Sequence, residues 1–326
     1  AGADRQRDMT DALEVLTVGR IGVDLYAEDL GVGLAGARRF AKSIGGSPTN
    51  VAVAAARLGR RSAVFTAVGE DELGAYVLEA LESFGVDTRF VGTHPTLPTP
   101  LVLAAMDPPE DPRIVFYRHP KAPDMEIRAE DVDLETARAV PILWISAGAL
   151  AEEPSRSTVR TLLGVRGRRP HTILDLDYRP PVWASEEEAR TTIGAAVEHA
   201  TVAVGNRAEC EIAVGTADPD AAADMLLDRG VRIAIVKLGG EGVLVATPAE
   251  RRLVPAVHVR VVCGLGAGDA FGGALCHGLL AGRDPYDAVE FANAAGALVA
   301  SRLLCADAMP TETEVLTLLG EARARR

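Results

Sequence analysis

The chain has few cysteines, few aromatic residues and no long apolar run, and each shortage excludes a class of protein. Of the 326 residues only four are cysteines, and 4% are aromatic. No two cysteines have the Cys-x-x-Cys spacing of a structural zinc site. A chain of this length buries enough core to fold without disulfides. We therefore expect a reducing, cytoplasmic setting, since the N-terminal residues lack the apolar segment of a secretion signal and no run reaches membrane-spanning length.

The chain also lacks an excess of positive charge. Its formal net charge is −12, so nucleic acid and anionic membranes are not expected partners. A small anionic substrate remains compatible with this charge, because a local pocket can be basic on an acidic protein. Hydrophobic residues make up 48% of the chain, which indicates a globular protein.

Short apolar runs alternate with amphipathic segments along most of the chain. This alternation predicts an α/β fold with a mostly parallel sheet and helices on both faces. Ser47 is the predicted N-cap of the first of these helices, with Pro48 at its first position. Strands are predicted at 13–19, 62–68, 141–147, 171–176, 201–205 and 232–237, and helices at 47–58, 71–84, 155–165, 185–199, 219–229, 268–281, 284–302 and 312–325.

Two regions, 24–44 and 93–127, interrupt this alternation. The second is rich in proline but contains strand-like runs at 100–105 and 113–118. We interpret both regions as a small sheet, or lid, that projects from a single domain. Residues 1–12 are expected to form a loose N-terminal arm before it.

Several glycine-rich stretches are candidate phosphate sites. The GVGLAG stretch at 31–36 fits the dinucleotide pattern, but no strand precedes it and no acidic residue follows at the required distance, so we predict a turn. The Walker phosphate loop is absent. The glycines at 264–268 instead lead into a helix start that carries Asp269, and such a start can bind an anion. From spacing alone, Asp269 is either a base or a helix cap. GGSPTN at 45–50 and KLGGEG at 237–242 are anion-binding turns or simple tight turns.

Together these stretches resemble a known family. GGSPTNVAVAAARLG at 45–59 and GLGAGDAFGGA at 264–274 resemble the two signatures of the ribokinase family, the PfkB-type carbohydrate kinases. The N-x-x-E pattern at 206–209 and KLGGEG resemble its nucleotide-binding motifs. The resemblance extends over residues 13–318. It implies a three-layer ribokinase-like α/β fold with a small β lid, and ATP-dependent phosphorylation of a carbohydrate.

The resemblance assigns roles in phosphoryl transfer. Asp269 would be the general base that takes the proton from the attacking sugar hydroxyl. The backbone N–H groups at the helix start would form an anion hole for the transferred group. These N–H groups belong to Gly266, Ala267 and Gly268.

A second set of residues is expected to bind ATP and Mg²⁺. Asn206 and Glu209 would orient Mg²⁺, through water because this ion dehydrates reluctantly. Without the resemblance, the pattern favours Glu209 as a surface helix residue. Asn293 would lie on the helix that closes the adenine site, or be a helix-surface amide. The remaining nucleotide-binding residues are Lys237, Gly239 and Gly242, with Gly268 at the phosphates.

The expected sugar site lies nearer the N-terminus. Asp24 would accept hydrogen bonds from substrate hydroxyls, and further stretches such as 175–183 resemble family members that act on a sugar acid. Arg118 and Arg179 are the candidates for its carboxylate, because arginine binds carboxylates with two parallel hydrogen bonds. Tyr117 would cover the sugar ring, with Lys121 as a weaker candidate ligand. The first glycine motif would supply Gly45, Gly46 and Asn50.

The alternatives are a kinase of 2-keto-3-deoxygluconate, fructose or ribose, or a sugar or nucleotide sensor that has lost catalysis. The chain keeps Asp269 and the glycines before it, which a sensor without catalysis would not need, so the sensor is disfavoured. Lids of this family often pair between subunits, so a homo-oligomer is expected. Many relatives bind a monovalent cation near Cys263 and Gly264, where they have other residues. Because a neutral thiol is a poor ligand for K⁺, we expect weak or absent K⁺ dependence and a packing role for Cys263.

Overall fold

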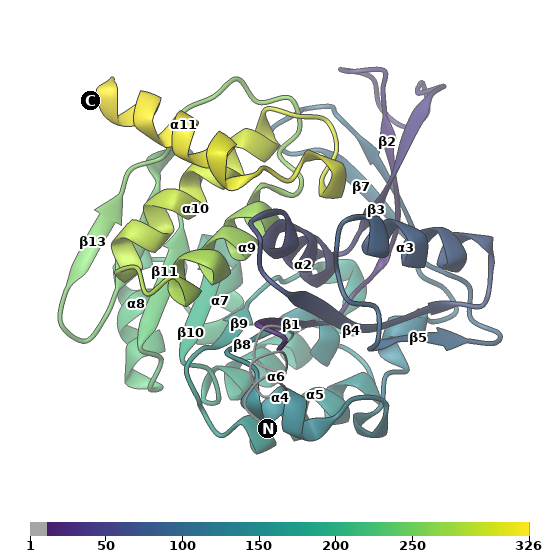
Figure 1. The fold of residues 1–326 in the computed structure, drawn as a ribbon, viewed down its shortest axis with the longest axis horizontal. Helices are drawn as coiled ribbons and strands as arrows, with labels where there is room; N and C mark the ends of the chain where they lie inside the picture. Colours follow the sequence, from purple (N-terminus) through teal and green to yellow (C-terminus); the bar gives the residue numbers. More distant parts are fainter. Residues whose placement is uncertain (1–11, 326) are drawn as a thin grey trace, which may run out of the picture.

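A nine-stranded sheet forms the centre of the protein in the computed structural model, which describes residues 12–325 (Figure 1). Its strand order is β13-β12-β11-β10-β9-β8-β1-β4-β5. Neighbouring strands are parallel except at β11, β12 and β13, which pair antiparallel. The strands are β1 (Val15–Val18), β4 (Ser62–Gly69), β5 (Val91–His94), β8 (Ile142–Ser146), β9 (Thr172–Asp175), β10 (Val202–Asn206), β11 (Ile233–Lys237), β12 (Val243–Ala246) and β13 (Arg251–Val254).

Helices cover both faces of this sheet, so its inner strands are buried on both sides, while the edge strands β5 and β13 are largely exposed (Figure 1). In β8, Ile142 and Trp144 pack into one core while Leu143 and Ile145 pack into the other. The predicted α/β class is thereby confirmed. One face carries α2 (Ser47–Arg57), α3 (Glu72–Ser83), α9 (Ala267–Leu280), α10 (Pro285–Ala300) and α11 (Glu312–Ala324), and the other carries α4 (Leu134–Ala139), α5 (Ser155–Arg166), α6 (Glu186–Val197), α7 (Arg207–Val214) and α8 (Pro219–Asp228).

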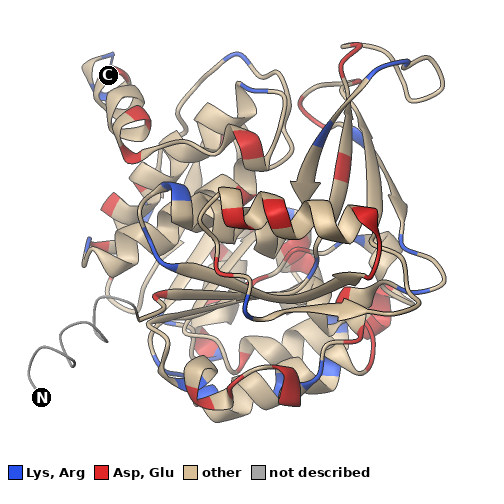
Figure 2. Cartoon of the chain, turned by 45° about the vertical axis from the view of Figure 1, so that its right-hand side comes forward, with Lys and Arg blue, Asp and Glu red and all other residues tan. Residues whose placement is uncertain are grey.

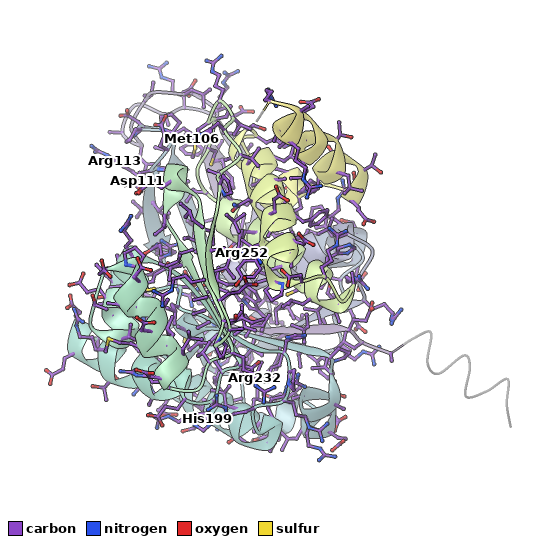
Figure 3. The ribbon with its side chains drawn as sticks, turned by 90° about the vertical axis from the view of Figure 1, so that its left-hand side faces the viewer. Met106, Asp111, Arg113, His199, Arg232 and Arg252 are labelled. Carbon is purple, nitrogen blue, oxygen red and sulfur yellow. The ribbon has the colours of Figure 1, made fainter. Side chains whose placement is uncertain are left out.

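The two irregular regions form a second, four-stranded sheet, which we call the lid. Its order is β3-β2-β6-β7, from β2 (Gly22–Ala27), β3 (Phe40–Gly45), β6 (Leu101–Ala105) and β7 (Arg113–Tyr117). The lid rises from one side of the large sheet, and its outer end carries both signs of charge (Figure 2). In Figure 3, Met106 and Asp111 lie at the opposite end of the molecule from His199 and Arg232.

Several sequence predictions need correction. Gly46, not Ser47, occupies the N-cap of α2, because the Ser47 hydroxyl instead donates to Asp269. Helix α7 was not predicted, since its eight residues give little periodicity. The four-residue strands β5, β12 and β13 were missed for the same reason. The 31–36 stretch is irregular, as expected, and the predicted arm at 1–12 falls outside the described residues except for residue 12.

Across residues 12–325, no helix combines the length and the apolar character needed to cross a membrane.

Candidate active site

The polar residues of the site stand at the carboxyl ends of the parallel strands. Arg20 follows β1, Ser146 ends β8, Asp175 ends β9 and Lys237 ends β11. The chain leaves β1 toward β4 on one side and later returns to β8 on the other. A reversal of this kind opens a crevice outside the strand ends, where α/β proteins bind ligands.

Asp269 lies in the first turn of α9 and is held by two residues of α2. Ser47 Oγ donates to Asp269 Oδ1 at 2.7 Å, and Asn50 Nδ2 donates to Oδ2 at 2.8 Å. Burial raises the pKa of Asp269, while these two hydrogen bonds oppose that rise. Each carboxylate oxygen therefore has a donor that fixes its direction and stabilises its ionised form.

A polar cavity of about 240 Å³ surrounds Asp269, between the strand ends and the lid. The lid contributes Ile114 and Phe116 to its wall. Ten of the residues predicted for the site line this cavity: Asp24, Gly46, Asn50, Arg118, Arg179, Glu209, Lys237, Gly266, Gly268 and Asp269. The fold thus brings together residues from seven separate segments of the chain.

A second, more apolar cavity of about 490 Å³ lies on the other side of the α9 start. Val257, Phe271 and Ala297 form part of its wall, which suits a flat aromatic base. The predicted nucleotide residues Lys237, Gly239, Gly242, Gly268 and Asn293 line it, together with Ala267 of the predicted anion hole. Lys237 and Gly268 line both cavities. Two ligands would therefore meet at the first turn of α9.

The start of α9 presents backbone N–H groups at this junction. Gly266 is its N-cap, with a φ of 78° that glycine adopts readily, and no side chain caps the helix. A Cβ on Gly266 would lie 2.5 Å from Cys305 Sγ, so a larger residue would not fit. The unpaired N–H groups and the helix dipole together favour an anion between the two cavities.

Comparisons with known proteins agree with this geometry. Residues 12–312 match the family model described as pfkB family carbohydrate kinase. This chain belongs to that family. The 5-dehydro-2-deoxygluconokinase of Geobacillus thermodenitrificans is 31% identical over 98% of this chain and 96% of its own.

Solved structures give the same result. A double mutant of fructokinase from Vibrio cholerae O395, with fructose, ADP and potassium ion bound, superposes with a TM-score of 0.83 at 29% identity. The match covers 95% of this chain and 99% of that one. A putative ribokinase II from E. coli, in complex with ATP and Mg²⁺, has a TM-score of 0.85 at 23% identity over 95% and 99% of the two chains, which supports the fold. The protein is an ATP-dependent sugar kinase with the ribokinase-like fold.

The N-x-x-E motif of this PfkB kinase forms a helix cap. Asn206 Oδ1 accepts from the Glu209 N–H at 2.9 Å, and Glu209 Oε2 accepts from the Asn206 N–H at 2.7 Å. Glu209 is buried, lines the polar cavity and lies 3.9 Å from Lys237 Nζ. Asn206 lines neither cavity. Within residues 12–325 no three His, Cys, Asp or Glu side chains could hold a metal ion together. This arrangement fits Mg²⁺ bound mainly by phosphates and water.

The lid residues predicted for the kinase's sugar site differ in position. Arg118 faces the cavity, but both its terminal nitrogens donate to Asp124, which is fully buried. Tyr117 is 58% exposed and lies on the other face of β7, so the prediction that it covers the sugar is wrong; Phe116 lines the cavity instead. Lys121 pairs with Glu126 and does not line the polar cavity.

Asp24 and the first glycine motif form the opposite wall. Tyr26 donates from its hydroxyl to Asp24 Oδ2 at 2.9 Å. Burial raises the pKa of Asp24 to about 6 despite this bond. Gly45 does not line the cavity but makes room for Asp24, because a Cβ there would lie 2.1 Å from the carboxylate.

Three buried residues of the kinase's polar cavity were not predicted from the sequence: Arg20, Asp175 and Asp177. Arg20 and Arg179 both pair with Asp177, which also accepts from Ser146 Oγ at 2.8 Å. Burial raises the pKa of Asp177, but the two guanidinium groups outweigh it and the pKa is lowered. Burial raises the pKa of nearby Asp175 to about 8. The alternating polar pattern of 175–179 at a strand end was the available signal for both aspartates.

Proposed function

We propose that this kinase transfers the γ-phosphate of ATP to the 6-hydroxyl of 5-dehydro-2-deoxy-D-gluconate, a step of myo-inositol catabolism. The observation that carries the proposal is one cavity in which Asp269 and three arginines, Arg20, Arg118 and Arg179, share a wall. A carboxylate base suits hydroxyl phosphorylation, and the guanidinium groups suit an acidic substrate. The name of the Geobacillus relative agrees with this substrate.

Asp269 acts as the base of the proposed reaction. Its carboxylate accepts the proton of the 6-hydroxyl while that oxygen forms a bond to the γ-phosphorus. The bond between the γ-phosphorus and the β–γ bridging oxygen breaks, and ADP leaves with the electron pair. Ser47 and Asn50 hold the carboxylate, because each donates to a different oxygen.

Charge on the transferred group is stabilised at the helix start. The N–H groups of Gly266, Ala267 and Gly268 form the anion hole, and Lys237 lies beside them in both cavity walls. The adenine occupies the apolar cavity, next to Asn293. Glu209, at the wall of the polar cavity, would orient Mg²⁺ through water, and Asn206 would support it through the capping box. The ion would supply positive charge to the phosphate oxygens.

Neutral sugars fit this cavity less well. Fructose and ribose have no anionic group for the arginines, whereas 2-keto-3-deoxygluconate does. The sugar acids are therefore the favoured class, and loops at the cavity rim discriminate between them.

An ATP-consumption screen over sugars and sugar acids tests the proposal. We expect the highest kcat/KM with 5-dehydro-2-deoxy-D-gluconate, lower values with 2-keto-3-deoxygluconate, and little turnover with fructose or ribose. A preference for a neutral sugar would overturn the substrate, and no turnover on any compound would favour a sensor.

We also propose a cytoplasmic homo-oligomer that pairs through the lids. Tyr117 and Val115 are exposed apolar side chains on the outer face of β7, and Leu103 of β6 lies opposite Val115 on that face. A second copy of the chain would cover them. Light scattering of Tyr117→Asp should then show a smaller particle than the wild type, and unchanged mass would contradict lid pairing. The four cysteines are free and buried, which suits a reducing compartment.

A further inference from the structure

Asp177 is the buried centre of a group of three charged side chains at the floor of the polar cavity. Its Oδ2 pairs with Arg20 Nη2, and its Oδ1 accepts from Arg179 Nε at 3.1 Å. Asp177 is 3% exposed and Arg20 5% exposed, whereas the Arg179 side chain is 45% exposed. Both arginines line the cavity. The carboxylate therefore holds two guanidinium groups side by side, facing the substrate space.

This group carries an excess of positive charge. Two guanidinium groups share a single carboxylate partner, since Asp177 is the ion-pair partner of both. Arg118 differs, because it has Asp124 to itself in a one-to-one pair. Buried charge is costly unless it is paired. Arg20 is buried and shares its one carboxylate partner with Arg179, so it is the cationic side chain of the cavity wall that most needs a further anion.

The pair also retains hydrogen-bond donors. Arg20 Nε is buried and has no hydrogen-bond partner among the described residues. A guanidinium group has five N–H donors, and the contact with Asp177 uses few of them. On Arg118, in contrast, both terminal nitrogens already donate to Asp124. Phe116 lies over Arg20, with its ring centre 6.0 Å from the guanidinium carbon, and helps to exclude water.

We propose that Arg20 and Arg179 bind the carboxylate of the substrate, and that Asp177 positions the two guanidinium groups for it. A carboxylate is planar, accepts several hydrogen bonds and supplies the missing negative charge. Arg20 is then a specificity-determining residue, and Arg118 shapes the cavity through Asp124. The inference rests on the proposed sugar-acid substrate and names the residues that recognise its acidic end.

The test compares a sugar acid with its uncharged carboxamide analogue. We expect Arg20→Gln to raise KM for 5-dehydro-2-deoxy-D-gluconate by about 10- to 150-fold, the range for losing a hydrogen bond to a charged group. KM for the carboxamide should change less than about threefold, with kcat at saturation and KM for ATP near wild type. Arg20→Lys keeps the ion pair with Asp177 but loses the paired N–H donors of the guanidinium group. It should therefore give a smaller loss of the same selectivity for the acid.

Arg118→Gln is the matched control, because it removes a guanidinium group from the same cavity. It should affect acid and carboxamide alike. Equal losses on both compounds for Arg20→Gln, or an acid-selective loss only for Arg118→Gln, would overturn the inference. Thermal unfolding checks the fold of each variant, and Arg20→Lys decides the question if Arg20→Gln does not fold.

Calorimetric binding separates this inference from the proposed function. If the wild type binds the acid far better than the carboxamide but does not phosphorylate it, the proposed reaction is wrong and the carboxylate site stands. Equal binding of acid and carboxamide by the wild type would overturn the carboxylate site, whatever the enzyme phosphorylates.

Discussion

Asn50 Nδ2 lies 2.8 Å from Oδ2 of Asp269, although 219 positions separate the two residues in the chain. This contact joins the two glycine motifs at Asp269, the proposed catalytic base. It requires α2 and α9 to pack closely. Gly273 of α9 meets α2 so tightly that a Cβ there would lie 2.3 Å from the Ala54 side chain.

Replacing the base tests the chemistry most directly. Asp269→Asn should lower kcat by about a hundredfold or more, because the amide cannot accept the hydroxyl proton. Asp269 does not line the cavity proposed for the nucleotide, so ATP should still bind in a fluorescence or calorimetric titration. Near-normal turnover by this variant would remove Asp269 from the role of base.

The hydrogen bonds to Asp269 should set the acid limb of the pH profile. Asn50 and Ser47 lower the pKa of Asp269, against the rise caused by burial. In Asn50→Ala the pKa should therefore be higher, and activity should be lost at a higher pH as the pH falls. The measurement is kcat/KM against pH for wild type, Ser47→Ala and Asn50→Ala. An acid limb that stays in place or moves to lower pH would contradict this account.

Asp24 should make the protein more stable in mild acid than at high pH. Its pKa is about 6 in the folded protein, against an ordinary value of 3.8 in the unfolded chain. The folded state therefore binds the proton more tightly, and this contribution is complete below pH 3.8 and lost as the pH rises through 6. Asp24→Asn cannot ionise, so its Tm should exceed that of the wild type by a few degrees at pH 8.

The difference in Tm should shrink as the pH falls through 6 toward 4. Asp29→Asn is the control, because backbone hydrogen bonds from Arg38 and Arg39 lower the pKa of Asp29. That variant should show no gain at pH 8. A stability gain of Asp24→Asn that is independent of pH would contradict the assigned ionisation.

Gly264 is expected to be required for lid closure. Its N–H donates to the carbonyl of Pro109 at 2.8 Å, and a Cβ there would lie 2.4 Å from the backbone oxygen of Glu110. Gly264→Thr should push the 107–112 loop away from the junction of the cavities. Water would then reach the phosphates, so ATP hydrolysis without sugar should rise severalfold relative to sugar phosphorylation. An unchanged ratio of the two rates would contradict a sealing role.

The cysteine beside this glycine bears on cation activation. Cys263 is fully buried, and burial raises the pKa of its thiol to about 11, so the thiol is neutral at physiological pH. Replacing Na⁺ by K⁺ in the assay should therefore change kcat by less than about twofold, since a neutral thiol is a poor K⁺ ligand. A large gain in rate with K⁺ would show this prediction wrong.

Local patterns were sufficient for the motifs and the α/β class. The spacing of neighbouring residues predicted that the glycines before Asp269 and the first glycine motif belong to the site. Residues of both stretches line the cavity. The N-x-x-E motif was also visible, although its capping box was not foreseen. Tyr117 and Phe116 were not distinguished, because neighbouring strand residues face opposite sides and only the register of β7 decides which one faces the cavity.

Periodicity, glycine placement and helix-start chemistry are properties of a few consecutive residues, so the chain alone was enough to predict them. Ion pairing is different. Arg20 and Asp177 are separated by 157 positions, and Arg118 reaches a buried Asp124 that no pattern marked. Which arginine is already neutralised and which still needs an anion depends on partners that the crossover connections of the sheet bring together. Arg179 was a candidate from the sequence, but only the tertiary structure pointed to Arg20 as its partner in the proposed carboxylate site.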